Sequence, residues 1–147
     1  MKKILLISCF LVCGLLSSQI VKAQTYFYGV YFCEGNNGTQ DNWNVFNSQS
    51  QNIPYYGQVY RNDEARSLKI IGSACIGHTI YIYDSSSNDT NKDWCEIFVK
   101  GVPDPSSPYI VPSFETSYEN SYVKVTFHRG PTDNGKLDGK VSGWKIL

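Results

Sequence analysis

Two short stretches of the chain, NDEARSLKI at residues 62–70 and DGKVSGWKI at residues 138–146, have the same layout. Each begins with an acid or amide and ends in a strand-like run that contains a Lys-Ile pair. Asn and Asp favour tight turns because their side chains bond nearby backbone groups. The pattern predicts a turn that leads into a strand, used twice in one chain. The two copies differ most at their fifth position, where the first has Arg66 and the second has Ser142.

A second pair of stretches repeats in the same order. Residues 31–43 (YFCEGNNGTQDNW) and 81–94 (YIYDSSSNDTNKDW) each contain a strand that ends in an acid, Glu34 or Asp84, and then a polar loop. A tryptophan, Trp43 or Trp94, then opens the next strand. The second unit is longer than the first, and we place its insertion at residues 102–112 and their neighbours. The sequence therefore predicts two copies of one four-strand unit.

Strands alone account for the apolar pattern, because no window has apolar residues at helical spacing. Clusters of Asn, Gly, Ser, Asp and Pro separate short alternating or aromatic runs. We expect strands at residues 25–32, 57–60, 67–72, 79–84, 95–101, 121–128 and 141–147. A unit of this kind would leave an apolar sheet face in water if it stood alone, so the two units should pack together. The prediction is an all-β single domain at 24–147, a β-sandwich of two Greek key motifs at about 25–73 and 74–147.

These repeats resemble the βγ-crystallin superfamily in its secreted or microbial form. The signature of that family is two acids or amides, two variable residues, a Ser or Thr and then a Ser, once in each Greek key. Residues 62–67 (NDEARS) and 138–143 (DGKVSG) correspond to its two copies. Many members bind calcium at two sites, each built from oxygens of the loop after the first strand, of the acidic start of the motif and of the hydroxyl at its fifth position.

The resemblance implies a set of calcium ligands, and calcium prefers 6 to 8 oxygen ligands. The candidates are Glu34, Asn62, Asp63, Asp84, Asp138 and Ser142. Local turn formation is the alternative role of Asn62, Asp63 and Asp138. Glu34 and Asp84 are, in the alternative, solvated loop acids.

Arg66 has five donors, no acceptor and a permanent positive charge, so it cannot ligate a cation. If its guanidinium points into the first site, it can pair with Asp63, Glu64 or Asp138 instead. We therefore expect one usable or weakened calcium site, with a dissociation constant of roughly 10⁻⁴ to 10⁻³ M, that stabilises the fold.

The N-terminal residues predict secretion. Lys2 and Lys3 precede an apolar run at residues 4–16, and compact residues precede a cleavage point after Ala23, so residues 1–23 are expected to be a signal peptide. The run is too short for a membrane span. Cleavage removes three lysines from a chain of zero formal charge. The mature chain is weakly acidic, which argues against nucleic-acid binding. We expect an extracellular or periplasmic monomer.

Three cysteines, Cys33, Cys75 and Cys95, follow the predicted signal peptide. In an oxidising compartment this odd number indicates one disulfide with one buried thiol, or a bridge to another chain. Three buried free thiols are the alternative. The spacing does not select a pair.

No motif predicts an enzyme. Neither His78 nor His128 has an acid, cysteine or serine at a motif spacing. A hydrolase would need one of them bonded to a carboxylate in a cleft. The rival function is a lectin-like or inhibitor-like protein that binds glycan or protein through its polar loops and aromatic residues. The tryptophans Trp43, Trp94 and Trp144 would then form a sugar platform, or else fill the core.

Overall fold

The computed structural model of the chain describes residues 28–58 and 61–147. The predicted signal peptide at residues 1–23 lies outside these residues, as do the first residues of the strand expected at 25–32. Within the described part of the chain, no helix has the length and apolar character needed to cross a membrane.

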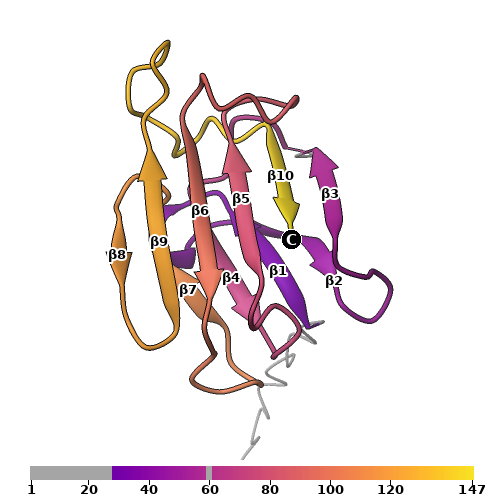
Figure 1. Cartoon of the computed structure of the whole chain (residues 1–147). Coiled ribbons are helices and arrows are strands. Elements are labelled where there is room, and N and C mark those ends of the chain that lie inside the picture. Colours follow the sequence, from indigo (N-terminus) through magenta and orange to yellow (C-terminus); the bar gives the residue numbers. More distant parts are fainter. Residues whose placement is uncertain (1–27, 59–60) are drawn as a thin grey trace, which may run out of the picture.

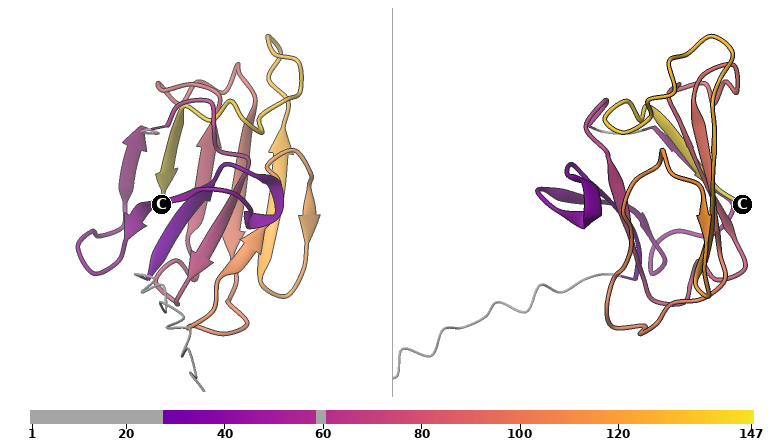
Figure 2. Two further views of the ribbon diagram at one scale, coloured as in Figure 1. Left: turned by 180° about the vertical axis from the view of Figure 1, so that it is seen from behind. Right: turned by 90° about the vertical axis from the view of Figure 1, so that its left-hand side faces the viewer.

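The described residues form strands in two antiparallel sheets, which face each other in the side view (Figures 1 and 2). One sheet has the strand order β2-β1-β4-β7, and the other has the order β3-β10-β5-β6-β9-β8. The strands of the first sheet are β1 (Gly29–Cys33), β2 (Asn42–Asn47), β4 (Ser67–Ile71) and β7 (Tyr109–Val111). Those of the second are β3 (Tyr55–Gln58), β5 (Thr79–Tyr83), β6 (Trp94–Val99), β8 (Tyr118–Glu119), β9 (Val123–His128) and β10 (Gly143–Ile146). A single 3₁₀ turn, η1 (Asn36–Gly38), follows β1. The all-β prediction is confirmed.

Strand pairing agrees with the repeat in the sequence. The first strand of each half pairs with the last, and the register places Tyr31 opposite Lys69 in one sheet and Tyr81 opposite Lys145 in the other. Tyr31 aligns with Tyr81 in the sequence repeat, and Lys69 aligns with Lys145. The two motif stretches therefore lead into equivalent strands with equivalent partners.

Each half also contributes one strand to the sheet of the other half. Strand β3 pairs with β10 in the six-stranded sheet, and β7 pairs with β4 in the four-stranded sheet. The predicted insertion at 102–112 was wrong in part, because it contains β7. This strand lies at a sheet edge and is only three residues long, so the prolines on either side of it do not interrupt a continuous ladder. The added element is instead the β8–β9 pair, which widens the second sheet beyond β6.

The core lies between the sheets and contains the inward side chains of both. Phe32 packs edge-on against Trp144 of the opposite sheet at a ring distance of 6.3 Å, and against Phe114 at 6.0 Å. Trp43 lies opposite Phe32 and also faces this core. Trp94, its partner in the sequence repeat, lies opposite Tyr83. In the strand of Tyr83, the inward side chains are those of Ile80 and Ile82, so Tyr83 is on the outer face. Trp94 therefore points to the outer face, since one residue of register reverses the side of a sheet.

The cysteines form no disulfide in the described structure. Cys33, Cys75 and Cys95 are free and buried, so the predicted disulfide is not found and the alternative of three buried thiols holds. Burial raises the pKa of all three thiols, to about 12 for Cys75. Thiols with a raised pKa stay protonated and are poor nucleophiles. They act here as small apolar residues.

The sixth position of the motif differs between the halves because the space differs. In the first half the buried Ser67 donates to the carbonyl of Gly35 at 2.6 Å and accepts from the amide of Gly38 at 2.9 Å. In the second half a Cβ at Gly143 would lie 2.5 Å from the carbonyl oxygen of Ser85 and 2.9 Å from Oδ1 of Asn88. In the first half, the hydroxyl of Ser67 thus holds the loop that follows β1. In the second half, the backbone of Gly143 packs directly against the loop that follows β5.

Replacing Gly143 by Ser, the residue of the first motif, should destabilise the protein by about 1–3 kcal/mol because the added atoms overpack the loop. Thermal unfolding of G143S measures the loss. The control is Gly101→Ser, where a Cβ would meet no atom within 4 Å and the backbone φ is not in the left-handed region. Equal midpoints for the two variants would contradict the steric argument.

Candidate functional site

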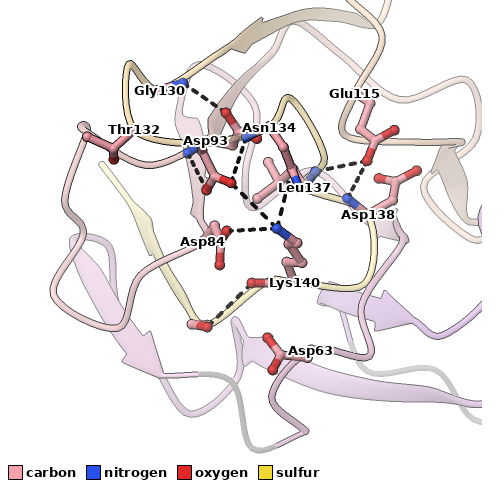
Figure 3. A network of polar contacts seen from close by, with 12 residues as sticks. Asp63, Asp84, Asp93, Glu115, Gly130, Thr132, Asn134, Leu137, Asp138 and Lys140 are labelled. Carbon is pink, nitrogen blue, oxygen red and sulfur yellow. Dashed lines mark hydrogen bonds and ion pairs between the residues drawn. The ribbon is translucent and has the colours of Figure 1, made fainter.

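Two polar clusters, formed by loops that join the strands at one end of the sheets, contain three of the six predicted calcium ligands: Asp84, Asp138 and Ser142. Figure 3 shows the second cluster around Lys140, with Glu115 and Asp138 beside it. Each cluster combines one loop that follows a first strand with the motif that precedes a last strand.

Asp138 is the centre of the first cluster. Its carboxylate accepts hydrogen bonds from Nδ2 of Asn36 at 2.6 Å, from Oγ of Ser113 at 2.7 Å and from the amide of Phe114 at 2.8 Å. Burial raises the pKa of Asp138, and these three donors partly offset that rise. The carboxylate of Glu115 accepts from the amide of Asp138 at 2.9 Å. The oxygens that could ligate a cation are thus already satisfied by protein donors.

Arg66 lies over the same loop. Its Nη1 is 3.4 Å from the backbone carbonyl oxygen of Asp138, and a Cβ at Gly139 would lie 2.8 Å from its Nη2. Among the described residues it has no ion pair with a carboxylate, so the expected pairing with Asp63, Glu64 or the Asp138 side chain is not found. The guanidinium instead donates to a carbonyl oxygen, which is a group that calcium would use.

Lys140 is the internal cation of the second cluster. Its Nζ lies 3.8 Å from Oδ2 of Asp84, 3.5 Å from Oδ1 of Asp133 and 3.4 Å from Oδ1 of Asn134 (Figure 3). The Asp84 and Asp133 side chains are 17% and 7% exposed. Ser142 follows in the motif, and its amide donates to the carbonyl of Tyr83 at 2.9 Å. The loop after β5 and the second motif are thereby held together.

The two carboxyl groups beside Lys140 titrate differently. Burial, reinforced by Asp133, raises the pKa of Asp84 to about 6. A hydrogen bond from Asp84 lowers the pKa of Asp133 to about 2. Two carboxylates this close are stable with one shared proton, because like charges disfavour double ionisation.

Asp93 is a buried acid that the sequence analysis missed. It has no exposed surface, its Oδ1 accepts from the amide of Gly130 at 2.8 Å, and its own amide lies 3.4 Å from Oδ2 of Asp133. Its Oδ2 has no hydrogen-bond partner. The only sequence signal was its position directly before the strand that Trp94 opens, which is too general to indicate burial.

The remaining predicted ligands are less closely connected. Asn62 and Asp63 are exposed and bond each other, with Nδ2 of Asn62 2.9 Å from Oδ2 of Asp63. Asp63 has a φ of 64°, and its amide donates to the carbonyl of Val141 at 3.3 Å. The side chain of Glu34 makes no hydrogen bond or ion pair within residues 28–58 and 61–147. The turn geometry of Asn62 and Asp63 matches their alternative role in local turn formation. Calcium ligation by Asn62, Asp63 and Glu34 stays a prediction.

No group of three or more His, Cys, Asp or Glu side chains in the described residues is arranged to hold a metal. One acid–imidazole pair exists outside the clusters, where Nε2 of His128 lies 3.4 Å from Oε1 of Glu96. Within the described chain, no serine, cysteine or tyrosine side chain is hydrogen-bonded to the carboxylate or the imidazole of this pair.

No protein-family model, curated protein or solved structure matches this chain.

The shared proton predicts how stability depends on pH. The folded-state pKa of Asp84 is raised from 3.8, so its contribution is complete below pH 3.8 and is lost as the pH rises through about 6. Asp133 contributes oppositely, and its share is lost only as the pH falls through about 2. The unfolding midpoint should therefore fall between pH 5 and pH 7, and Asp84→Asn should flatten this fall because the amide imitates the protonated acid. Asp41→Asn, at an exposed loop acid, is the control. A pH dependence in D84N as steep as in the parent chain would exclude the shared proton.

Proposed function

We propose that the mature chain is a secreted, non-enzymatic module of two Greek keys, similar to the βγ-crystallins, which binds calcium weakly at one site to stabilise its fold. The observation that carries this proposal is the exchange of strands between the sheets. In each half the last strand lies beside the first and the first beside the second, while the third strand joins the other sheet. Paired Greek keys have the fourth strand next to the first in the same way.

The contacts in the two clusters support a difference between the two halves. In the first cluster, Arg66 donates a hydrogen bond to the backbone carbonyl of Asp138. The carboxylate of Asp138 accepts hydrogen bonds from three protein donors. In the second cluster, Ser142 retains the hydroxyl at the fifth position of the motif. Its amide donates to the carbonyl of Tyr83, the residue before Asp84. The amide of Asp63 donates to the carbonyl of Val141, the residue before Ser142. The second cluster is therefore the calcium site that we propose.

Lys140 sets the affinity of that site. An ammonium 3.8 Å from Asp84 competes with any cation for the same carboxylate. Calcium must displace it or bind beside it, and both cost electrostatic energy. We therefore expect weak binding, with a dissociation constant of roughly 10⁻⁴ to 10⁻³ M, as in extracellular calcium modules.

Calcium should raise the unfolding midpoint of the mature protein. With a dissociation constant near 1 mM, about 10 mM calcium stabilises the native state by about 1.4 kcal/mol, which corresponds to a few degrees. Differential scanning fluorimetry in calcium and in chelator measures the shift. Magnesium at the same concentration controls for ionic strength. An absence of any calcium-specific shift would refute the proposed site.

Replacing Arg66 by Ser should increase the calcium response, because it removes a fixed positive charge and restores a hydroxyl at the fifth position of the first motif. Calcium titrations of R66S and the parent chain, followed by calorimetry, compare the affinities. Arg61→Ser is the matched control, since Arg61 pairs with Asp41 and Glu64 rather than with Asp138. Equal affinities in R66S and in the parent chain would show that Arg66 does not occupy a calcium position.

A further inference from the structure

The outer face of the six-stranded sheet carries a regular grid of side chains. The register aligns Tyr83, Trp94 and His128 in one row across the strands, and Tyr81, Glu96 and Thr126 in the next. A third row holds Thr79, Phe98 and Lys124. All of these side chains point away from the core, because the residues between them along each strand are core residues or pack against the core.

The aromatic row is closed to a ligand. The rings of Trp94 and His128 are parallel within 8° at a centroid distance of 3.8 Å, so the imidazole covers one face of the indole. Tyr83 flanks the indole on its other side at 6.2 Å and is itself buried. Trp43 and Trp144 face the core. A sugar platform made of the three tryptophans is therefore excluded by their geometry.

Phe98, in contrast, is a free ring. It is 40% exposed, and its cross-strand neighbours are Thr79 and Lys124, so no aromatic side chain of the described chain stacks on it. It borders a shallow depression of about 270 Å³. The residues that line the depression are Thr79, Glu96, Phe98, Lys124 and Thr126.

The polar groups around this ring have unused hydrogen-bonding capacity. The side chains of Thr79, Thr126 and Lys124 make no hydrogen bond within the described residues. Glu96 makes a single contact there, to His128. This differs from the loops, where side chains such as Asp104 and Asn120 bond their own backbone. Two hydroxyls, an ammonium and a carboxylate thus offer both donors and acceptors around one apolar ring.

We propose that this depression binds one pyranose ring of a neutral glycan. A pyranose has an apolar C–H face, which packs on an exposed aromatic ring, and hydroxyls at its edge, which both donate and accept hydrogen bonds. Specific sites for small ligands combine apolar contact with a few placed polar groups in this way. Glu96 and Lys124 carry opposite charges, so the depression has no net charge that would favour an anionic ligand.

The glycan site does not depend on the calcium site. It lies on the sheet face, it uses none of the loop ligands, and its occupancy should be unchanged by chelator. Loss of calcium binding would therefore leave this proposal intact, and loss of glycan binding would leave the calcium proposal intact.

Affinity electrophoresis of the mature protein in native gels tests the proposal. The neutral probes are hydroxyethyl cellulose, a soluble β-1,3-glucan and galactomannan, and the anionic probe is alginate. We expect retardation by at least one neutral polysaccharide, in chelator as well as in calcium. Absence of retardation by all three neutral probes would overturn the proposal. So would retardation by alginate alone that added salt abolishes.

Variants then locate the site. Phe98→Ala should weaken binding about tenfold or more, the loss expected when one well-packed aromatic contact is removed. Glu96→Gln should weaken it as well, because it removes a charged acceptor and keeps the shape. Ile110→Ala is the matched control, since Ile110 is an exposed apolar residue on the other sheet, 38% accessible. Because Phe98 is 40% exposed and points away from the core, F98A should stay folded with an unfolding midpoint lowered by only a few degrees, and binding is compared well below that midpoint. Unchanged retardation of both F98A and E96Q would exclude the site.

Discussion

The exchange of β3 and β7 between the two sheets is the constraint on which the rest of the structure depends. Each exchanged strand pairs with the last strand of the other half, β10 or β4, and so ties the two halves through backbone hydrogen bonds as well as through the core. Neither half can complete its sheet alone. The loops that follow β1 and β5 are brought together with the motifs that precede β4 and β10, and these segments form the two polar clusters.

Those clusters show how the chain satisfies its buried charges internally. Lys140 lies among Asp84, Asp133 and Asn134, and Arg66 donates to the carbonyl of Asp138. A buried or half-buried acid is costly unless it is paired or hydrogen-bonded. Cationic side chains of the protein supply that pairing without requiring an ion from the solvent. The loops are consequently held in place by contacts within the chain itself.

The sequence predicted the repeat well and its details less well. The offsets that align Tyr31 with Tyr81 and Lys69 with Lys145 agree with the pairing of those residues in the sheets, because the alternation of buried and outward residues fixes the register. Trp43 and Trp94 aligned equally well but face opposite ways, since the inserted residue between them reverses the side. Strand β7 was missed because it is short and lies among prolines. Asp93 and the ion pairs of Lys140 depend on contacts between distant loops, which local patterns do not encode.

The β8–β9 pair has no counterpart among the described residues of the first half, and it makes the outer faces of the two sheets different. A strict duplication would give two equivalent outer faces, related by the symmetry of the two halves. Here only one sheet is widened, and Lys124 and Thr126 of the added strand β9 line the depression on that sheet. The widened face therefore lies on one side of the described chain. If it binds glycan as we propose, one copy of this site engages one polymer strand, and the same site could link two strands only through a second copy of the chain.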